Sequence, residues 1–213
     1  MRRSIIIGLI FSFLLSLLFV LFLVNAVAIS FTKLGLTVQQ TFAIFLAVLI
    51  GGYINIPVSR RRVVVTERRA LPYPFFYYPP QVAEQVIFVN VGGAVIPVLL
   101  SLYFLPKAPL EPTIIATFIV AAVAKALARP VPGVGIQMPA FIPPIVSAFV
   151  ALLLAPGHAA VVAYISGVIG TLAGADLLNL GRIRKIGSLA VSIGGAGVFD
   201  GVFLVGIIAA LLT

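Results

Sequence analysis

The chain has 213 residues, of which 62% are apolar and only 9% are charged, and its mean hydropathy is +1.25. A soluble domain carries about 25% charged residues, because its surface needs charge for solvation. The composition therefore excludes a cytosolic globular enzyme, a disordered tail and a coiled coil. It predicts a multi-pass membrane protein whose outer solvent is lipid.

The scarcity of cysteine and histidine excludes several kinds of catalytic and metal site. The sequence has no cysteine and one histidine, His158. A disulfide framework, a thiolate nucleophile, a cysteine zinc site and a His-x-x-x-His zinc helix are thereby excluded, and we expect no metal and no other cofactor. The formal charge of +9 comes from short basic clusters between apolar runs, which set membrane orientation. We therefore expect no nucleic-acid partner.

Apolar runs long enough to cross about 30 Å of hydrocarbon need about 20 residues, or fewer where the helix is buried or broken. The fold class that we predict is an all-α membrane protein with about seven transmembrane helices, several of them short or broken by Gly and Pro. The predicted spans are residues 4–29, 36–58, 82–104, 112–128, 138–155, 158–180 and 188–212.

The first run has a second interpretation as a signal peptide, since Ala26-Val27-Ala28 has the spacing of a cleavage site. The apolar run is longer than the 7–15 residues of a usual signal-peptide core. We therefore predict that the helix is retained.

Basic residues alternate between the two sides of these spans. With the N-terminus inside, the outside loops hold only Lys33 and Lys107. The inside loops hold the other twelve: Arg2, Arg3, Arg60, Arg61, Arg62, Arg68, Arg69, Lys125, Arg129, Arg182, Arg184 and Lys185. Positive charge favours the cytoplasmic side, so we predict a protein of the cell membrane with a cytoplasmic N-terminus and an external C-terminus.

The longest polar stretch divides the chain into three parts. Residues 1–58 form an N-terminal two-helix segment, residues 59–81 a cytoplasmic basic and aromatic loop, and residues 82–213 a five-span core. The loop suits contact with anionic headgroups and the membrane interface, and its alternative role is docking of a partner. It is too short to be a catalytic domain, so any chemistry is expected within the spans or at their ends.

Two acids, Asp176 and Asp200, fall inside apolar runs. A carboxylate in hydrocarbon costs several kcal/mol, so it usually faces a bundle interior or a wet cavity and marks function. The alternative for each is a structural hydrogen bond to a neighbouring helix. These two aspartates are the candidate catalytic residues.

Glycines surround both acids. The pairs Gly170/Gly174 and Gly197/Gly201 have the Gly-x-x-x-Gly spacing that lets helices approach backbone to backbone. We expect a close crossing of the last two spans that brings the carboxyl groups within reach of one shared proton, so that they titrate in two coupled steps. The residues Gly194, Gly195 and Gly197 would unwind the start of the last span and bring Asp200 to the depth of Asp176.

Other segments also look broken. Asn90, Gly92, Gly93 and Pro97 interrupt the third predicted span, and their pattern recurs at Ser192-Ile193-Gly194-Gly195 with an offset of 102 residues, either as a parallel repeat or by coincidence. Residues 130–144, which include Pro139, cannot form one regular helix because prolines break it. Irregular backbone at membrane depth is tolerated where it lines a cavity, and we expect residues 130–144 to do so.

Several motifs resemble a family of uncharacterised prokaryotic integral membrane proteins, a domain of unknown function. The resemblance covers about residues 80–213, and it is carried by the segments that begin at Val89, Arg129, Gly170 and Ser192. It implies no specific activity.

A weaker resemblance is to intramembrane aspartyl proteases of the presenilin and prepilin-peptidase kind. Phe199-Asp200 matches one of their motifs, Gly174-Ala175-Asp176 matches Gly-x-Gly-Asp except at Ala175, and Pro139-Ala140-Phe141 is close to Pro-Ala-Leu. The order of the two aspartates is reversed. The resemblance implies that a pair of aspartates performs hydrolysis.

Three functions remain open. The first is an intramembrane aspartyl protease-like hydrolase acting on a membrane-embedded peptide. The second is a proton- or cation-coupled transporter or channel that uses the same acids as a relay. The third is a non-catalytic membrane subunit in which the aspartates bind neighbouring helices. The bilayer is the one certain partner, and the sequence leaves the oligomeric state open.

Overall fold

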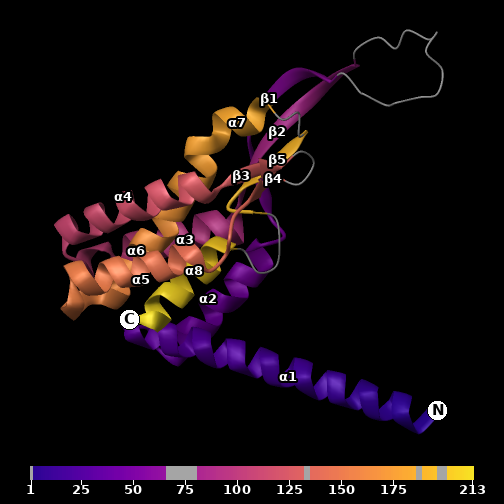
Figure 1. Cartoon of the computed structure of the whole chain (residues 1–213), viewed down its shortest axis with the longest axis vertical. Helices are drawn as coiled ribbons and strands as arrows, with labels where there is room; N and C mark the ends of the chain where they lie inside the picture. The colour runs from indigo at the N-terminus through magenta and orange to yellow at the C-terminus, as the bar shows by residue number, and fades with distance from the viewer. Residues whose placement is uncertain (1, 66–80, 132–134, 186–188, 196–200) are drawn as a thin grey trace.

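The computed structural model describes residues 2–65, 81–131, 135–185, 189–195 and 201–213 (Figure 1). Within them the chain is mainly helical, and a small sheet lies at one end of a helical bundle. The helical part of the predicted fold class is confirmed. The description as all-α is wrong, because the structure also contains β-strands.

Helix α6 (Ala159–Thr171) is the centre of the bundle. Eleven of its thirteen residues are buried, and α4 (Leu110–Leu127), α5 (Ile142–Leu154), α8 (Gly201–Leu212) and α3 (Ile96–Phe104) pack against it. A helix satisfies all its backbone hydrogen bonds within one segment. This is why apolar runs that avoid water take this form.

Small residues set the distances between these helices. A Cβ atom at Gly174 would overlap the carbonyl oxygen of Ala121 in α4, and one at Gly170 would lie 2.8 Å from Val120. At Gly206 of α8, a Cβ atom would lie 2.8 Å from Tyr164. The predicted backbone-to-backbone approach at Gly170 and Gly174 is confirmed, but its partner is α4 and not the last helix.

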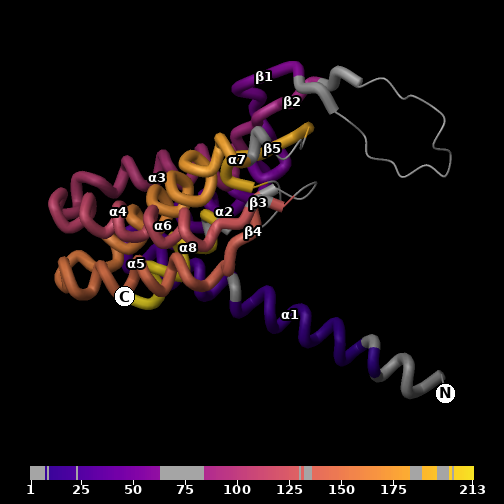
Figure 2. The backbone as a smooth tube through the Cα atoms, turned by 45° about the horizontal axis from the view of Figure 1, so that its top comes forward, coloured from indigo at the N-terminus to yellow at the C-terminus, as the bar shows by residue number. Residues whose placement is uncertain are grey.

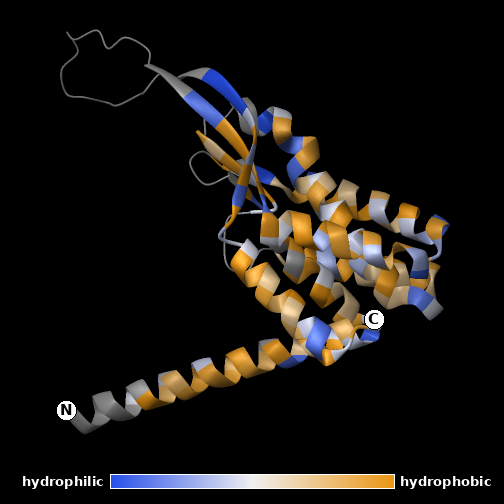
Figure 3. Cartoon of the chain, turned by 180° about the vertical axis from the view of Figure 1, so that it is seen from behind, coloured by the Kyte–Doolittle hydropathy of each residue, from blue (hydrophilic) through white to orange (hydrophobic). Residues whose placement is uncertain are grey.

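Helix α1 (Arg2–Lys33) contacts the bundle only near its C-terminal end. Phe31 is buried, Ser30 Oγ donates to the carbonyl oxygen of Ile207 at 3.0 Å, and Lys33 Nζ donates to that of Leu211 at 2.9 Å. The rest of α1 extends away from the bundle and is almost wholly apolar (Figures 2 and 3). The most apolar 18-residue window of Ile10–Lys33 has a mean hydropathy of 2.7 and is almost entirely exposed, so lipid is its natural surrounding.

The sheet joins three strands in the order β1-β2-β5. Strand β1 (Asn55–Val65) pairs antiparallel with β2 (Gln81–Asn90), and β5 (Ala190–Ile193) pairs parallel with β2 on its other side. A separate hairpin joins β3 (Arg129–Val131) to β4 (Gly135–Gln137). The strands lie at the end of the bundle opposite the C-terminus (Figure 1).

These strands correct four predictions. The predicted spans 36–58 and 82–104 are helical only over α2 (Val38–Gly51) and from residue 91 onward, and part of the predicted loop 59–81 lies in β1 and β2. The predicted span 188–212 begins with β5, and its described helical part is α8 alone. Short apolar runs do not distinguish a buried strand from a helix by periodicity. The β-branched and aromatic content of residues 63–65 and 86–89 was the signal that favoured strands.

The connecting elements are short. A π-helix, η1 (Val91–Val95), precedes α3, and the 3₁₀-helix η2 (Leu105–Lys107) follows it. The 3₁₀-helix η3 (Pro156–His158) precedes α6, which continues through the π-helix η4 (Leu172–Asp176), the 3₁₀-helix η5 (Leu177–Asn179) and α7 (Leu180–Lys185).

Three helical stretches in the described part of the chain are long and apolar enough to cross a membrane: Ile10–Lys33, Leu110–Leu127 and Pro156–Arg182. Shorter apolar helices cover Val38–Gly51, Val91–Lys107 and Ile142–Leu154. This is compatible with membrane localisation, and seven crossings stay a prediction.

The expectation that residues 130–144 are not one helix is confirmed where the structure describes them, since β3 and β4 precede α5. The two cavities described below are lined by other segments.

Candidate functional site: a polar junction at the end of the bundle

The last residues of β2 and β5 lie side by side, and each strand leads through a Gly-Gly pair toward a helix (Figure 1). The two similar sequence motifs are therefore neighbours in space. Phe88 pairs with Ser192 and Val89 with Ile193, so the sheet register is displaced by two residues from the sequence offset. We call this region, around Asn55, Asn90, Asp176, Ser192 and Gly194, the junction.

Asn90 caps the first motif. Its Oδ1 accepts from the Gly93 N–H at 2.8 Å, and its Nδ2 donates to the Gly52 carbonyl at 2.8 Å and to Asn55 Oδ1 at 3.2 Å. The side chain is fully buried. At Gly92 a Cβ atom would overlap backbone atoms of Val48 and Gly52. These contacts give Asn90, Gly92 and Gly93 a structural role.

Pro97 and Pro139 lie at the starts of helices. Pro97 is buried at the second residue of α3, directly after the π-helix η1. Pro139 is exposed before α5, and its carbonyl accepts from the Ile142 N–H at 3.4 Å. Neither proline forms a hydrogen bond with the polar side chains of the junction.

Asp176 ends the π-helix η4, a feature that is frequent at functional sites. Its Oδ2 accepts a hydrogen bond from the Gly194 N–H at 2.8 Å. The acid therefore contacts the segment that leads toward Asp200. Gly174 supports this position by letting η4 lie against α4.

Asn179 is a residue that sequence analysis did not select. It is fully buried, and its Nδ2 donates to the carbonyls of Gly174 and Ala175 at 3.1 and 3.0 Å. These are carbonyls of the π-helix, so Asn179 holds the turn that presents Asp176. Its position within Leu177-Leu178-Asn179-Leu180 was the signal, because an amide in an apolar run is buried at a cost unless it is hydrogen-bonded.

The second motif is turned rather than helical. Gly194 and Gly195 have φ angles of +81° and +82°, a region that side chains rarely adopt. A Cβ atom at Gly194 would also lie 2.7 Å from the Ala94 Cβ. The expected unwound backbone at these two glycines is confirmed.

Asp200 and Gly197 lie outside the described residues, and Gly201 is the first residue of α8. Val202, two residues after Asp200, is buried in the same hydrophobic cluster as Leu172 and Ala94. Leu172 is the first residue of η4. The start of α8 and the turn that carries Asp176 therefore share one core, and contact between the two carboxyl groups stays a prediction.

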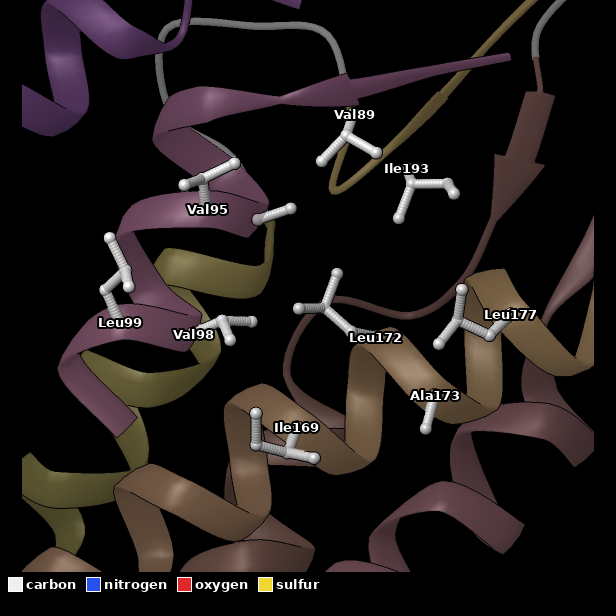
Figure 4. A pocket seen from close by; sticks show the side chains of 10 residues that line it. Val89, Val95, Val98, Leu99, Ile169, Leu172, Ala173, Leu177 and Ile193 are labelled. Carbon is white, nitrogen blue, oxygen red and sulfur yellow. The ribbon is translucent and has the colours of Figure 1, made fainter. Parts of the chain in front are cut away.

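An apolar cavity of about 400 Å³ lies beside the junction, between α3, η4 and the strand ends (Figure 4). Val89 and Ile193 reach it from β2 and β5, and Leu172 and Leu177 from the other side. A groove of about 610 Å³ between α3 and α4 shares Ile169, Ala173 and Leu177 with it. Together they form an aliphatic surface that extends from the junction along the bundle.

No group of three or more His, Asp or Glu side chains that could hold a metal occurs among the residues that the structure describes. The functional groups of the junction are therefore a carboxylate, amides, a hydroxyl and backbone polar groups.

Comparison with protein families gives a match over residues 49–212 to the family described as "Protein of unknown function (DUF1614)". The chain belongs to this family. The match contains the whole junction, α3 to α8 and both cavities, and it confirms the resemblance to an uncharacterised family. Comparison with curated proteins and with solved structures gives no match.

Proposed function

We propose that this DUF1614 protein is an intramembrane hydrolase of the aspartyl protease type, with Asp176 and Asp200 as its catalytic pair. The observation that carries the proposal is the hydrogen bond from the Gly194 N–H to Asp176 Oδ2. It ties one acid to the start of the segment that holds the other.

Such a pair performs hydrolysis with no other group. One carboxylate takes a proton from water as the water oxygen attacks the substrate carbonyl carbon, and the other carboxylic acid donates its proton to that carbonyl oxygen. When the C–N bond breaks, the leaving nitrogen receives a proton from the pair. Two acids with one proton between them meet this need.

The aliphatic cavity supports a membrane-embedded peptide as the substrate. It lies beside the junction and is lined entirely by apolar side chains. A groove that continues between α3 and α4 would let an apolar segment approach from the lipid without crossing water.

The proposal includes seven crossings with a cytoplasmic N-terminus and an external C-terminus. Lys33 Nζ donates to the Leu211 carbonyl, two residues before the C-terminus, and Lys107 Nζ donates to that of Leu34. The two predicted outside lysines thus share one end of the molecule with the C-terminus. A reporter fused after Thr213 should score as external, and a cytoplasmic score would contradict this topology.

A second candidate function is a proton relay. Tyr164 Oη and Thr171 Oγ1, two turns apart on α6, are buried and have no hydrogen-bond partner among the residues that the structure describes. Asp176 follows Thr171 by one π-helical turn of five residues. These groups are the observation that favours transport over hydrolysis.

A transition-state analogue tests the hydrolase directly, because such compounds bind more tightly than substrates. The probe is an apolar hydroxyethylene peptide with a photoreactive group, added to the protein in liposomes. Labelling is expected in the wild type and in G181A, where an added Cβ meets no atom within 4 Å. It should be lost in D176N and in D200N.

Equal labelling of D176N and wild type would contradict the proposal. Proton uptake by the same liposomes distinguishes the second candidate. Uptake that is lost in both D176N and T171V, together with absence of labelling, would establish the relay instead.

A further inference from the structure

Strand β5 has one edge that pairs with no other strand of the described chain. A parallel ladder uses the backbone groups of alternate residues of each strand. The Val86 N–H donates to the Leu189 carbonyl at 2.8 Å, which assigns the odd-numbered residues of β5 to the bonds with β2. The N–H and C=O groups of Ala190 and Ser192 therefore point to the opposite edge, as does the N–H of Gly194.

Asp176 lies on this free edge. The N–H groups of Ala190, Ser192 and Gly194 all point to the edge away from β2, and Asp176 binds the last of them. A second strand paired with the free edge would run along two residues of β5 and then reach the carboxyl group. The edge and the acid form one continuous surface.

The apolar cavity lies next to the same edge. Val89 and Ile193 are paired residues on neighbouring strands, and both side chains point into the cavity (Figure 4). Paired residues of adjacent strands place their side chains on the same face of a sheet. The residue of an added strand that lies beside Ile193 would therefore present its side chain to this cavity.

We infer that the free edge of β5 binds an extended peptide by strand addition and delivers its backbone to Asp176, with an aliphatic side chain in the cavity lined by Val89, Ile193 and Leu172. This inference rests on the proposed function for its substrate. An edge strand recognises a peptide through main-chain hydrogen bonds, and pockets for alternate side chains give specificity. Both features are present here, and a lipid tail would use only the second.

Ala190 offers a variant that removes one donor of the free edge. It is exposed, and its N–H takes no part in the ladder with β2. Proline is tolerated on an edge strand where the N–H faces away from the sheet. The variant A190P should therefore fold, and A190V is the matched control that keeps the N–H.

The experiment measures binding of a fluorescent seven-residue peptide of alternating alanine and leucine to the full chain in detergent micelles. Loss of one hydrogen bond of about 1 kcal/mol predicts that A190P binds about fivefold more weakly, with A190V unchanged. Peptides N-methylated at single positions should lose affinity at every second position, because only alternate N–H groups face β5.

Equal affinity of A190P and A190V, or a methylation pattern without this alternation, would overturn the inference. A folding defect in A190P is recognised by comparing its melting temperature with that of A190V, and the methylation series gives the answer with the wild-type protein alone. The inference and the proposed function fail separately. If N-methylation weakens binding at every second position but the hydroxyethylene probe labels nothing, the protein binds peptides without hydrolysing them. If the probe labels the protein but N-methylation shows no such alternation, the protein is a hydrolase that binds its substrate in another way.

Discussion

The two Gly-Gly motifs at the ends of β2 and β5 have similar sequences and adjacent positions, yet their polar groups are satisfied in different ways. In the first motif Asn90 binds the Gly93 N–H three residues ahead in its own segment. In the second motif the Gly194 N–H is bound by Asp176 from another helix. The first motif is closed by its own cap. The second motif also has a local bond, from Ser192 Oγ to the Gly195 carbonyl at 2.6 Å, but its Gly194 N–H is bound by an ionisable side chain from elsewhere in the chain.

This difference is the reason that the proposed function places the chemistry at the second motif. A locally closed cap can be built from any good N-cap residue, so the first motif needs no acid. A partly buried carboxylate is a costly way to bind one N–H, and under the proposed function its presence at the second motif serves acid–base chemistry. The following variants test this contrast.

The largest expected effect is on activity. In D176N the amide oxygen still accepts from the Gly194 N–H, so folding should be retained while acid–base chemistry is lost. We expect the rate of peptide cleavage to fall by about 10²–10⁴-fold. The melting temperature in detergent should stay close to that of the wild type. Full activity of both D176N and D200N would assign these acids a structural role only.

The next largest effect is on stability at the second motif. In G194A the side chain meets both a left-handed backbone and the Ala94 Cβ at 2.7 Å, and the two costs together are about 2–5 kcal/mol. The free energy of unfolding is measured by denaturant titration in micelles. The control G181A should be neutral or slightly stabilising, and an equally small effect of G194A would show that the turn is not required.

Removal of the cap at the first motif should cost less. The variant N90A leaves the Gly93 N–H and the Gly52 carbonyl without their buried partner, at about 1–3 kcal/mol. Its intrinsic hydrolytic rate should be unchanged once the protein is folded. The exposed Asn25 of α1 provides the control N25A, and a loss of rate in N90A at full stability would remove the contrast between the motifs.

The smallest effect is expected at Ser192, a half-buried residue whose hydroxyl has one hydrogen to donate, with the Gly195 carbonyl at 2.6 Å and Asn55 Oδ1 at 2.8 Å as its acceptors. The variant S192A should lose about 0.5–1.5 kcal/mol of unfolding free energy, compared with no loss for the exposed S16A. A destabilisation larger than that of N90A would place the structural cap at the second motif.

The sequence singled out residues that lie at the junction, namely Asp176, Gly194 and Gly195, but it did not predict the elements around them. Asp176 stood out because a carboxylate in an apolar run has few structural reasons to be there, and Gly194 and Gly195 because glycine pairs favour turned backbone. The strands were missed because β2 and the start of α3 form one continuous apolar run in the sequence. Their pairing depends on β5, about a hundred residues away, and no local pattern indicates such a contact.

The roles of Asn179 and Asn55 could also not be predicted from the sequence. Asn179 matters because a π-helix frees the carbonyls of Gly174 and Ala175, and sequence periodicity does not predict a π-helix. Asn55 accepts from Asn90 and Ser192 at once, which requires that β1, β2 and β5 be brought together. The role of Asn55 follows from tertiary structure, and that of Asn179 from a local irregularity of the helix.

The central claim is that Asp176 and Asp200 meet, and the absence of cysteine from the chain allows a direct test. The double variant D176C/D200C is oxidised in membranes and disulfide formation is followed by mass spectrometry. The pair R61C/Q85C, on facing positions of β1 and β2, is the positive control, since paired strand residues lie within the Cα separation of a disulfide. The pair H158C/D176C, about 27 Å apart along one helix, is the negative control. The account predicts that D176C/D200C closes as readily as R61C/Q85C, and a pair that stays reduced like H158C/D176C would contradict it.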